Sequence, residues 1–209
     1  MRRYTFLVLI FCFLFVSKNQ AKTYFVAVNG NDTTNPGTIV APFATITRAQ
    51  KDVESGDTVY VRGGKYEMAE RQIARKQRIW AMMHLLNKSG KEGQRINYWA
   101  YQNERPVFDM SNVKPLNQRV MAFNVTGSWI HLKGLEVVGT QVTILGHTQS
   151  ECFHNEGSHN IYEQLSMHDG QAIGFYLIRG SDNLILNCDA YRNWDYTSEG
   201  GRGGNADGF

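Results

Sequence analysis

The sequence has no apolar run long enough to cross a bilayer. Its longest unbroken apolar run is Phe6–Val16, whereas a membrane-spanning helix needs about 20 apolar residues. The run follows the basic start Met1–Arg3 and precedes a polar segment that ends at the small residue Ala21. This pattern is typical of a secretory signal peptide. We therefore expect removal of residues 1–21, secretion to the extracellular or periplasmic space, and no membrane span.

The mature chain also lacks a net charge. The whole sequence has 22 Lys and Arg residues against 19 Asp and Glu residues, and the predicted signal peptide carries Arg2, Arg3, Lys18 and no acid. Removing it leaves 19 basic and 19 acidic residues. Because the mature chain carries no net positive charge, we do not expect a nucleic-acid partner.

Cysteine is scarce, which excludes a disulfide-stapled scaffold. Of the three cysteines, Cys12 lies in the predicted signal peptide, and Cys152 and Cys188 remain. Two cysteines are too few for a disulfide framework. A single bridge between them is possible in principle, but buried free thiols are the expected state.

Several catalytic motifs are missing as well. The glycine-rich stretch 200–204 lacks the Lys-Ser/Thr pair and the following helix of a phosphate-binding loop. No Gly-x-Ser-x-Gly nucleophile motif occurs. His147, His154, His159 and His168 are not spaced as zinc ligands on one element. Nucleotide-phosphate binding, serine-nucleophile chemistry and a zinc site are therefore disfavoured.

The N-terminal half predicts a small cap followed by strands. Thr23–Val28 and Thr58–Arg62 are rich in β-branched and aromatic residues, which is typical of strands. Between them, Pro42–Glu54 has apolar residues at helical spacing and predicts a short amphipathic helix. Arg95–Tyr101 and Val107–Asp109 predict further strands.

A basic run interrupts this part of the chain. Arg71, Arg75, Lys76 and Arg78 lie within residues 67–91 and lead into the apolar residues 79–83. The favoured interpretation is a solvated helix or an extended excursion. The alternative is contact with an anionic polymer.

The C-terminal half contains an internal repeat. Gly127-Ser128, Gly157-Ser158 and Gly180-Ser181 recur at offsets of 30 and 23 residues, each after an aromatic-bearing strand. Each pair precedes a second predicted strand: Ile130–Val137, Ile161–Met167 and Leu184–Ala190. The alignment gives Leu135, Leu165 and Cys188 one shared position, and Val137, Met167 and Ala190 another.

Apolar and polar residues alternate in these second strands, so one face of each strand points inward. Stacked coils of this length predict an all-β solenoid, a parallel β-helix with a short helix-containing N-terminal cap. The competing antiparallel sandwich would need tight turns every 8 to 12 residues. We expect residues 22–110 to form the cap and first coils, residues 111–209 to form further coils, and the protein to be a monomer.

The end of the chain resembles a known family. The stretch NLILNCDAYRN at residues 183–193, followed by Asn205–Phe209 (NADGF), is similar to polysaccharide lyase family nine. These are secreted pectate lyases and related pectin-backbone lyases with a right-handed parallel β-helix. Tyr24–Tyr66 also resembles the N-terminal cap of many secreted β-helix proteins, which supports the architecture rather than the reaction. Together these stretches cover about a third of the chain closely.

The resemblance implies calcium-dependent β-elimination and names Asp207 as a Ca²⁺ ligand. Calcium binds 6–8 oxygen ligands, and it offsets the negative charge that develops next to a uronate carboxylate. In the family, the remaining acidic ligands and a catalytic lysine follow on later coils, beyond Phe209 in this sequence. We therefore expect a C-terminally truncated β-helix that lacks the catalytic lysine and has weak or no turnover.

Arg192 and Asp195 are candidate substrate contacts, because an arginine pairs well with uronate carboxylates. For these residues and for Asp189, surface roles at turns are the alternative. Asp207 itself has a structural alternative, an Asx turn at a coil corner.

Three functions remain open at this stage. The first is a lyase that acts on an acidic polysaccharide, either polygalacturonate (pectin) or the rhamnogalacturonan backbone. The second is a glycoside hydrolase, which would need a pair of carboxylates across the scissile bond. The third is a non-catalytic carbohydrate-binding or surface β-helix protein.

Overall fold

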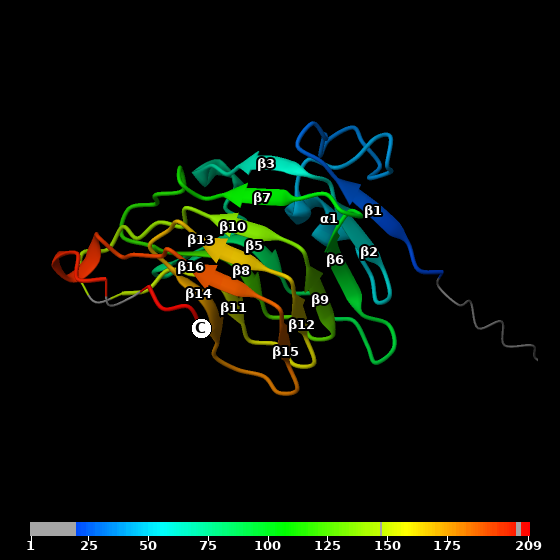
Figure 1. Cartoon of the computed structure of the whole chain (residues 1–209). Helices are drawn as coiled ribbons and strands as arrows, with labels where there is room; N and C mark the ends of the chain where they lie inside the picture. The colour runs from blue at the N-terminus through cyan, green and yellow to red at the C-terminus, as the bar shows by residue number, and fades with distance from the viewer. Residues whose placement is uncertain (1–19, 147, 204–205) are drawn as a thin grey trace, which may run out of the picture.

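The computed structural model describes residues 20–146, 148–203 and 206–209. Almost all of the predicted signal peptide lies outside these ranges. The chain winds through three sheets in turn, and strands that are far apart in the sequence stack side by side (Figure 1). No helix in the described ranges has the length and apolar character needed to span a bilayer.

We call the three sheets A, B and C. Sheet A contains β1 (Thr23–Val26), β2 (Thr58–Val61), β6 (Ile96–Ala100), β9 (Ile130–Lys133), β12 (Ile161–Glu163) and β15 (Leu184–Leu186), in that order. Sheet B contains β3 (Gly64–Glu67), β7 (Pro106–Asp109), β10 (Glu136–Val138), β13 (Ser166–His168) and β16 (Asp189–Tyr191). Sheet C contains β4 (Arg75–Gln77), β5 (Trp80–Leu86), β8 (Arg119–Val125), β11 (Glu151–Asn155) and β14 (Ile173–Leu177).

The strands pair in parallel in all three sheets, apart from the antiparallel pair β4–β5. Val137 pairs with Met167, and Met167 pairs with Ala190, as the sequence repeat predicts. The right-handed parallel β-helix is thus confirmed, and the alternative of an antiparallel sandwich is wrong.

The repeated Gly-Ser turns connect sheet C to sheet A. The Ser158 N–H donates to Ser128 Oγ at 3.0 Å, and the Ser181 N–H donates to Ser158 Oγ at 3.1 Å. A Cβ atom at Gly157 would lie 1.9 Å from the carbonyl oxygen of Gly127, so the coils approach each other too closely here for any side chain. Serine therefore links the coils, and glycine permits their contact.

The corner between sheets A and B divides each second strand in two. The prediction that each second strand is continuous is therefore wrong. It concerned Ile130–Val137, Ile161–Met167 and Leu184–Ala190. Gly134 (φ 69°), Gln164 (φ 54°) and Asn187 (φ 51°) adopt left-handed backbone conformations, which turn the chain from sheet A into sheet B. Glycine and asparagine favour this conformation, but glutamine does not, so the corner could not be identified from a residue pattern.

The N-terminal cap contains a shorter helix than predicted. Helix α1 (Ile46–Asp52) begins after the N-cap residue Thr45, whose side chain accepts from the Arg48 N–H at 3.0 Å. The predicted start at Pro42 is wrong because Phe43 is extended. The Phe43 N–H donates to the Phe25 carbonyl oxygen at 2.9 Å, and its own carbonyl accepts from the Ala27 N–H.

The basic run forms neither a solvated helix nor a simple extended segment. A short 3₁₀ helix, η1 (Glu70–Gln72), leads into the hairpin of β4 and β5. Strand β5 is largely buried and pairs with β8, so it is the first of the parallel strands of sheet C. Its apolar residues therefore belong to the β-helix, while all three residues of β4 are exposed.

The interior is built from rows of apolar side chains that repeat from coil to coil. Tyr98, Leu132 and Tyr162 form one such row along sheet A and are fully buried. Ile185 continues this row on β15, yet 37% of its surface is exposed. In sheet C, the Phe153 ring stacks on Phe123 with centroids 4.9 Å apart.

Cys152 and Cys188 are both free thiols. Burial raises the pKa of the Cys152 thiol to about 12, so it is unreactive at neutral pH. Cys188 is only half-buried, at the corner that follows β15. The prediction of unpaired thiols is confirmed, and the prediction that they are buried holds for Cys152 only.

Candidate functional site

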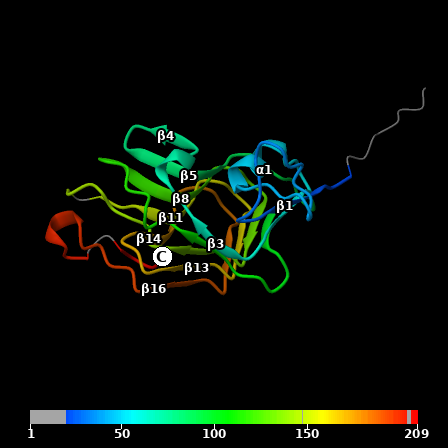
Figure 2. The same ribbon diagram turned by 90° about the horizontal axis from the view of Figure 1, so that it is seen from above.

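Asp207 lies beside β14, on the edge of sheet C. The Gly174 N–H donates to the Asp207 carbonyl oxygen at 2.9 Å, and the Phe175 N–H donates to the Gly208 carbonyl oxygen at 3.0 Å. Residues 206–209 therefore run along β14 as the start of a further coil, and the C-terminal residue lies next to sheet C (Figure 2). Asp207 is exposed.

The surroundings of Asp207 offer few other ligands for a cation. The hollow next to it is lined mainly by apolar side chains, including Ile173, Phe175 and Ile185, together with Gln149. Among the described residues, no three His, Cys, Asp or Glu side chains come together as a metal site. Calcium needs 6–8 oxygen ligands. The side chains present here therefore supply one carboxylate toward such a site and do not complete it.

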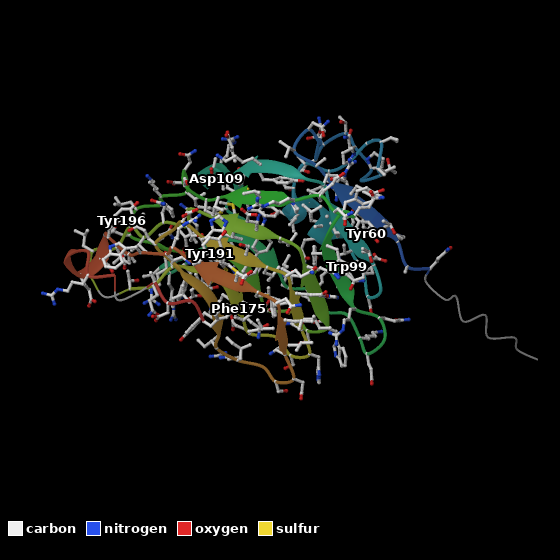
Figure 3. The ribbon with its side chains drawn as sticks, in the orientation of Figure 1. Tyr60, Trp99, Asp109, Phe175, Tyr191 and Tyr196 are labelled. Atoms are coloured by element: carbon white, nitrogen blue, oxygen red, sulfur yellow. The ribbon has the colours of Figure 1, made fainter. Side chains whose placement is uncertain are left out.

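Arg192 is held on the outer face of sheet B. Its Nε and Nη2 donate to the two carboxylate oxygens of Asp169, both at 2.6 Å, and its guanidinium lies 4.8 Å from the ring centroid of Tyr191. His168 stacks on the same tyrosine with ring centroids 4.4 Å apart, and its Nδ1 lies 2.7 Å from Asp169 Oδ2. Figure 3 shows Tyr191 on this face.

This pairing determines the charge state of Asp169. The hydrogen bonds from Arg192, and secondarily from His168, hold the pKa of the Asp169 carboxyl well below its usual range. The bidentate pair occupies two of the guanidinium nitrogens of Arg192. A substrate role for Arg192 would require this pair to open, and it stays a prediction.

Asp195 is buried in the long loop after β16, with 1% of its surface exposed. Its carboxylate accepts from the Thr197 N–H at 3.0 Å and from the Ser198 N–H at 2.9 Å, and it also contacts the Ser198 hydroxyl. These bonds hold the turn that leads into the 3₁₀ helix η2 (Ser198–Gly200). This geometry favours the structural alternative, and the substrate role of Asp195 stays a prediction.

A cleft crosses the outer face of sheet C. One wall contains Arg78 and Trp80, from the hairpin of β4 and β5, and the other contains Arg179, from the loop after β14. Met121 and His154 form part of the floor between them. Sequence reasoning did not predict this cleft, although the basic run before β5 was a signal that one of its walls carries charge.

His154, in the floor of the cleft, is paired with a buried acid. Glu151 and His154 are 1% and 4% exposed, and the His154 Nδ1 contacts the Glu151 carboxylate. The His154 Nε2 lies 3.4 Å from a carboxylate oxygen of Glu156. The Trp80 ring lies above, with its centroid 6.1 Å from that of the histidine. Because both ring nitrogens face a carboxylate, the imidazole has a fixed orientation.

A group of aromatic side chains covers part of the outer face of sheet A. Tyr60 and Trp99 occupy paired positions on β2 and β6, with ring centroids 6.3 Å apart (Figure 3). Tyr101 and His131 pack edge-on against these rings, at 5.4 Å from Tyr60 and 5.2 Å from Trp99 respectively. The edge-to-face geometry indicates a packed surface cluster that stabilises this end of the sheet.

Comparison with known proteins identifies the family. Residues 24–209 match the family described as "Pel9A-like, right handed beta helix region". This chain belongs to that family. It is 34% identical over 192 residues to pectate lyase L of Dickeya dadantii (strain 3937), an alignment that covers 90% of this chain and 40% of the relative.

Two solved structures extend the comparison. A structure titled rhamnogalacturonan lyase has 50% sequence identity and a TM-score of 0.87, and the match covers 90% of this chain and 46% of that one. The crystal structure of pectate lyase Pel9A has 31% identity and a TM-score of 0.65, with 83% and 40% covered. The chain thus spans less than half the length of the proteins it matches.

Proposed function

We propose that this chain is part of a secreted polysaccharide lyase that cleaves a pectic backbone by β-elimination with the help of calcium. The observation that carries the proposal is the position of Asp207. This carboxylate lies exposed on the strand edge next to β14, at the end of the continuous outer face of sheet C. A long face of aligned strands suits an extended polymer.

The reaction follows from the chemistry of a uronate. A base removes the proton from the carbon next to the carboxylate, and the C–H electron pair forms a C=C bond. The glycosidic C–O bond breaks, and its oxygen leaves with the electron pair and takes up a proton, so no water is consumed. A bound Ca²⁺ supplies positive charge that offsets the negative charge developing at the carboxylate. In this chain, Asp207 would help to hold the cation, and the outer face of sheet C would bind and orient the sugar chain.

The similarities favour the rhamnogalacturonan backbone over polygalacturonate. The structure titled rhamnogalacturonan lyase has a higher identity and TM-score than Pel9A does, over a larger share of this chain. Both polymers contain a galacturonate with the same acidic proton, so the reaction would be the same for either.

The proposal is tested by measuring absorbance of the unsaturated uronate product on both polymers, with Ca²⁺ and with chelator. In the protein expressed from the complete reading frame, we expect Ca²⁺-dependent product and at least about a 100-fold loss in Asp207→Asn, because a charged ligand is lost. Asp182→Asn is the matched control, since Asp182 is an exposed carboxylate in the loop after β14. The 209-residue chain alone should show weak or no turnover.

Three results would overturn the proposal. Full activity of Asp207→Asn would exclude the assigned role of that carboxylate. Saturated products that appear with consumption of water would indicate a glycoside hydrolase. Binding of either polymer without any product from the complete protein would favour the non-catalytic carbohydrate-binding function.

A further inference from the structure

The cleft on sheet C brings cationic side chains from two distant parts of the sequence to opposite walls. Arg78 comes from the hairpin before β5, and Arg179 comes from the loop after β14. Arg78 forms no ion pair with any residue in the described ranges. Arg179 is 74% exposed at its side chain and reaches only 3.9 Å from Glu156. Both guanidinium groups are therefore accessible to a ligand.

The carboxylates nearby do not cancel this charge. Glu151 is buried against His154, and Glu156 is shared between His154 and Arg179. Arg75 is a further exposed cation. It pairs with Met82 across the hairpin, and Met82 lines the cleft, so Arg75 lies next to the cleft. The balance of charge at the cleft is positive.

Trp80 and Arg119 make one wall rigid. The Arg119 guanidinium lies 4.8 Å from the Trp80 ring centroid, and its Nε donates to the Thr148 hydroxyl at 2.5 Å. The other two guanidinium nitrogens of Arg119 have no hydrogen-bond partner among the described side chains and backbone groups. A stacked, anchored arginine is well suited to hold its aromatic partner in one orientation.

The floor contains a polar group that lacks a partner. Asn124 is fully buried and lines the cleft, and its side-chain oxygen accepts no hydrogen bond from any described residue. Its Nδ2 contacts only the Met121 sulfur, at 3.0 Å. Because buried polar atoms are usually satisfied, Asn124 is an exception among the polar groups beneath the cleft.

We propose that this cleft is a subsite for an acidic sugar of the bound polymer, with Arg78 and Arg179 holding its carboxylate and Trp80 bounding its ring. The inference rests on the proposed function, because it takes the same polymer as its ligand. Arginine pairs with a carboxylate through parallel hydrogen bonds, which a neutral sugar cannot provide. The cleft would thus select for charge on a sugar that lies across sheet C, toward the hairpin of β4 and β5.

The position of the cleft predicts a dependence on chain length. Strand β5 and residues 206–209 are separated by β8, β11 and β14. With strands about 4.8 Å apart, this corresponds to about 19 Å between the hairpin side of the cleft and Asp207. A polymer lying across the strands would reach from the hairpin wall to Asp207, whereas a disaccharide would not.

The test is calorimetric binding of oligogalacturonates and of rhamnogalacturonan oligosaccharides to the 209-residue chain in the presence of chelator. Arg78→Gln and Arg179→Gln should each weaken binding about 5- to 30-fold, the loss expected for a charge-assisted hydrogen-bonded pair. Glutamine at residue 78 retains a long side chain at this left-handed position (φ 52°). Carboxyl-reduced oligosaccharides should bind weakly and equally to all variants.

Lys76→Gln is the matched control. Lys76 lies on the same hairpin, one residue from Arg75 and opposite the buried Ala81, and it does not line the cleft. Its removal should change affinity less than twofold. Equal losses in Lys76→Gln and Arg78→Gln, unchanged affinity in both arginine variants, or no binding by the wild type would each overturn the inference.

The outcomes of the two tests are separable. Arginine-dependent binding in chelator without product from the complete protein would overturn the lyase proposal and support the subsite. Calcium-dependent product with unchanged affinity in the arginine variants would support the lyase proposal and overturn the subsite. Circular dichroism of each variant shows whether it is folded.

Discussion

At the residue scale, the most unusual side chain is His84. It lies between Phe108 and Phe123, with ring centroids 5.3 and 4.7 Å away, and it is 2% exposed. Neither of its ring nitrogens has a hydrogen-bond partner among the described residues. Burial lowers the pKa of His84 to about 3, so the imidazole is neutral in the folded protein at neutral pH.

His84 makes stability depend on pH. An unfolded histidine has a pKa near 6.5, so between about pH 3 and 6.5 the unfolded state binds more protons than the folded state. The contribution of His84 to the free energy of unfolding is therefore complete above pH 6.5 and is lost as the pH falls toward 3. The slope is up to about 1.4 kcal/mol per pH unit.

We expect His84→Leu to remove this contribution. Urea denaturation at pH 5 and pH 7 should show a change in the free energy of unfolding that is about 2 kcal/mol smaller in the variant than in the wild type. Comparing the two proteins cancels the contributions of the other titrating groups. An identical pH dependence in both would show that His84 is protonated equally in the folded and unfolded states.

At the scale of the element, asparagines bind one turn to the next. The Asn160 Nδ2 donates to the Gly127 carbonyl at 2.9 Å and to Asn155 Oδ1 at 2.9 Å, while its Oδ1 accepts from the Ile130 N–H at 2.8 Å. Asn160 is fully buried. One side chain therefore satisfies buried groups in its own coil and in the preceding one.

Asn160→Ala should lower the free energy of unfolding by about 2–4 kcal/mol, because it leaves several buried polar groups without partners. Asn183→Ala is the matched control. Asn183 bonds the Asn160 N–H at 2.9 Å and the Gly157 carbonyl at 3.0 Å, but it is only half-buried. We expect Asn183→Ala to lower the free energy of unfolding by about 1 kcal/mol. Equal losses, measured by urea denaturation, would contradict a burial-dependent role.

The elements differ in how far the sequence predicts them. The alignment of Val137, Met167 and Ala190 was predictable because a core position repeats its chemistry from coil to coil. The left-handed conformation at Gln164 was not, since stacking between two neighbouring corners imposes it. The start of α1 was misplaced because Phe43 pairs with β1, a contact that helical periodicity does not encode.

The candidate site was less predictable than the fold. Asp207 was identified through the resemblance of its motif, and its exposed position beside β14 required the structure. The cleft could not be predicted, because Arg78 and Arg179 become neighbours only when β5, β8, β11 and β14 are stacked. Spacing along a chain does not report contacts made across coils.

At the scale of the whole molecule, the coils differ in how many neighbours they have. β9 and β12 lie between other strands of sheet A, whereas β15 and β16 are the last described strands of their sheets (Figure 1). All three residues of β15 are exposed. In a solenoid, each coil is stabilised mainly by its nearest neighbours.

Amide hydrogen exchange should therefore vary along the β-helix. In the 209-residue chain we expect the slowest exchange in β9 and β12 and the fastest strand exchange in β15 and β16, because local opening of the latter exposes little additional surface. Mass spectrometry of peptic fragments measures this gradient. Uniform protection across all strands would indicate a single cooperative unit rather than stacked coils.

The loop corner after sheet B has a practical consequence for protein engineering. Twelve residues separate β10 from β11, whereas only four separate β13 from β14, and the strands on either side keep their register. Gly146, in the longer loop, has no atom near the place of its absent Cβ. Foreign peptides, fluorophores or protease sites inserted there should leave the winding of the chain undisturbed, which makes this corner the natural place to tether the protein to a surface.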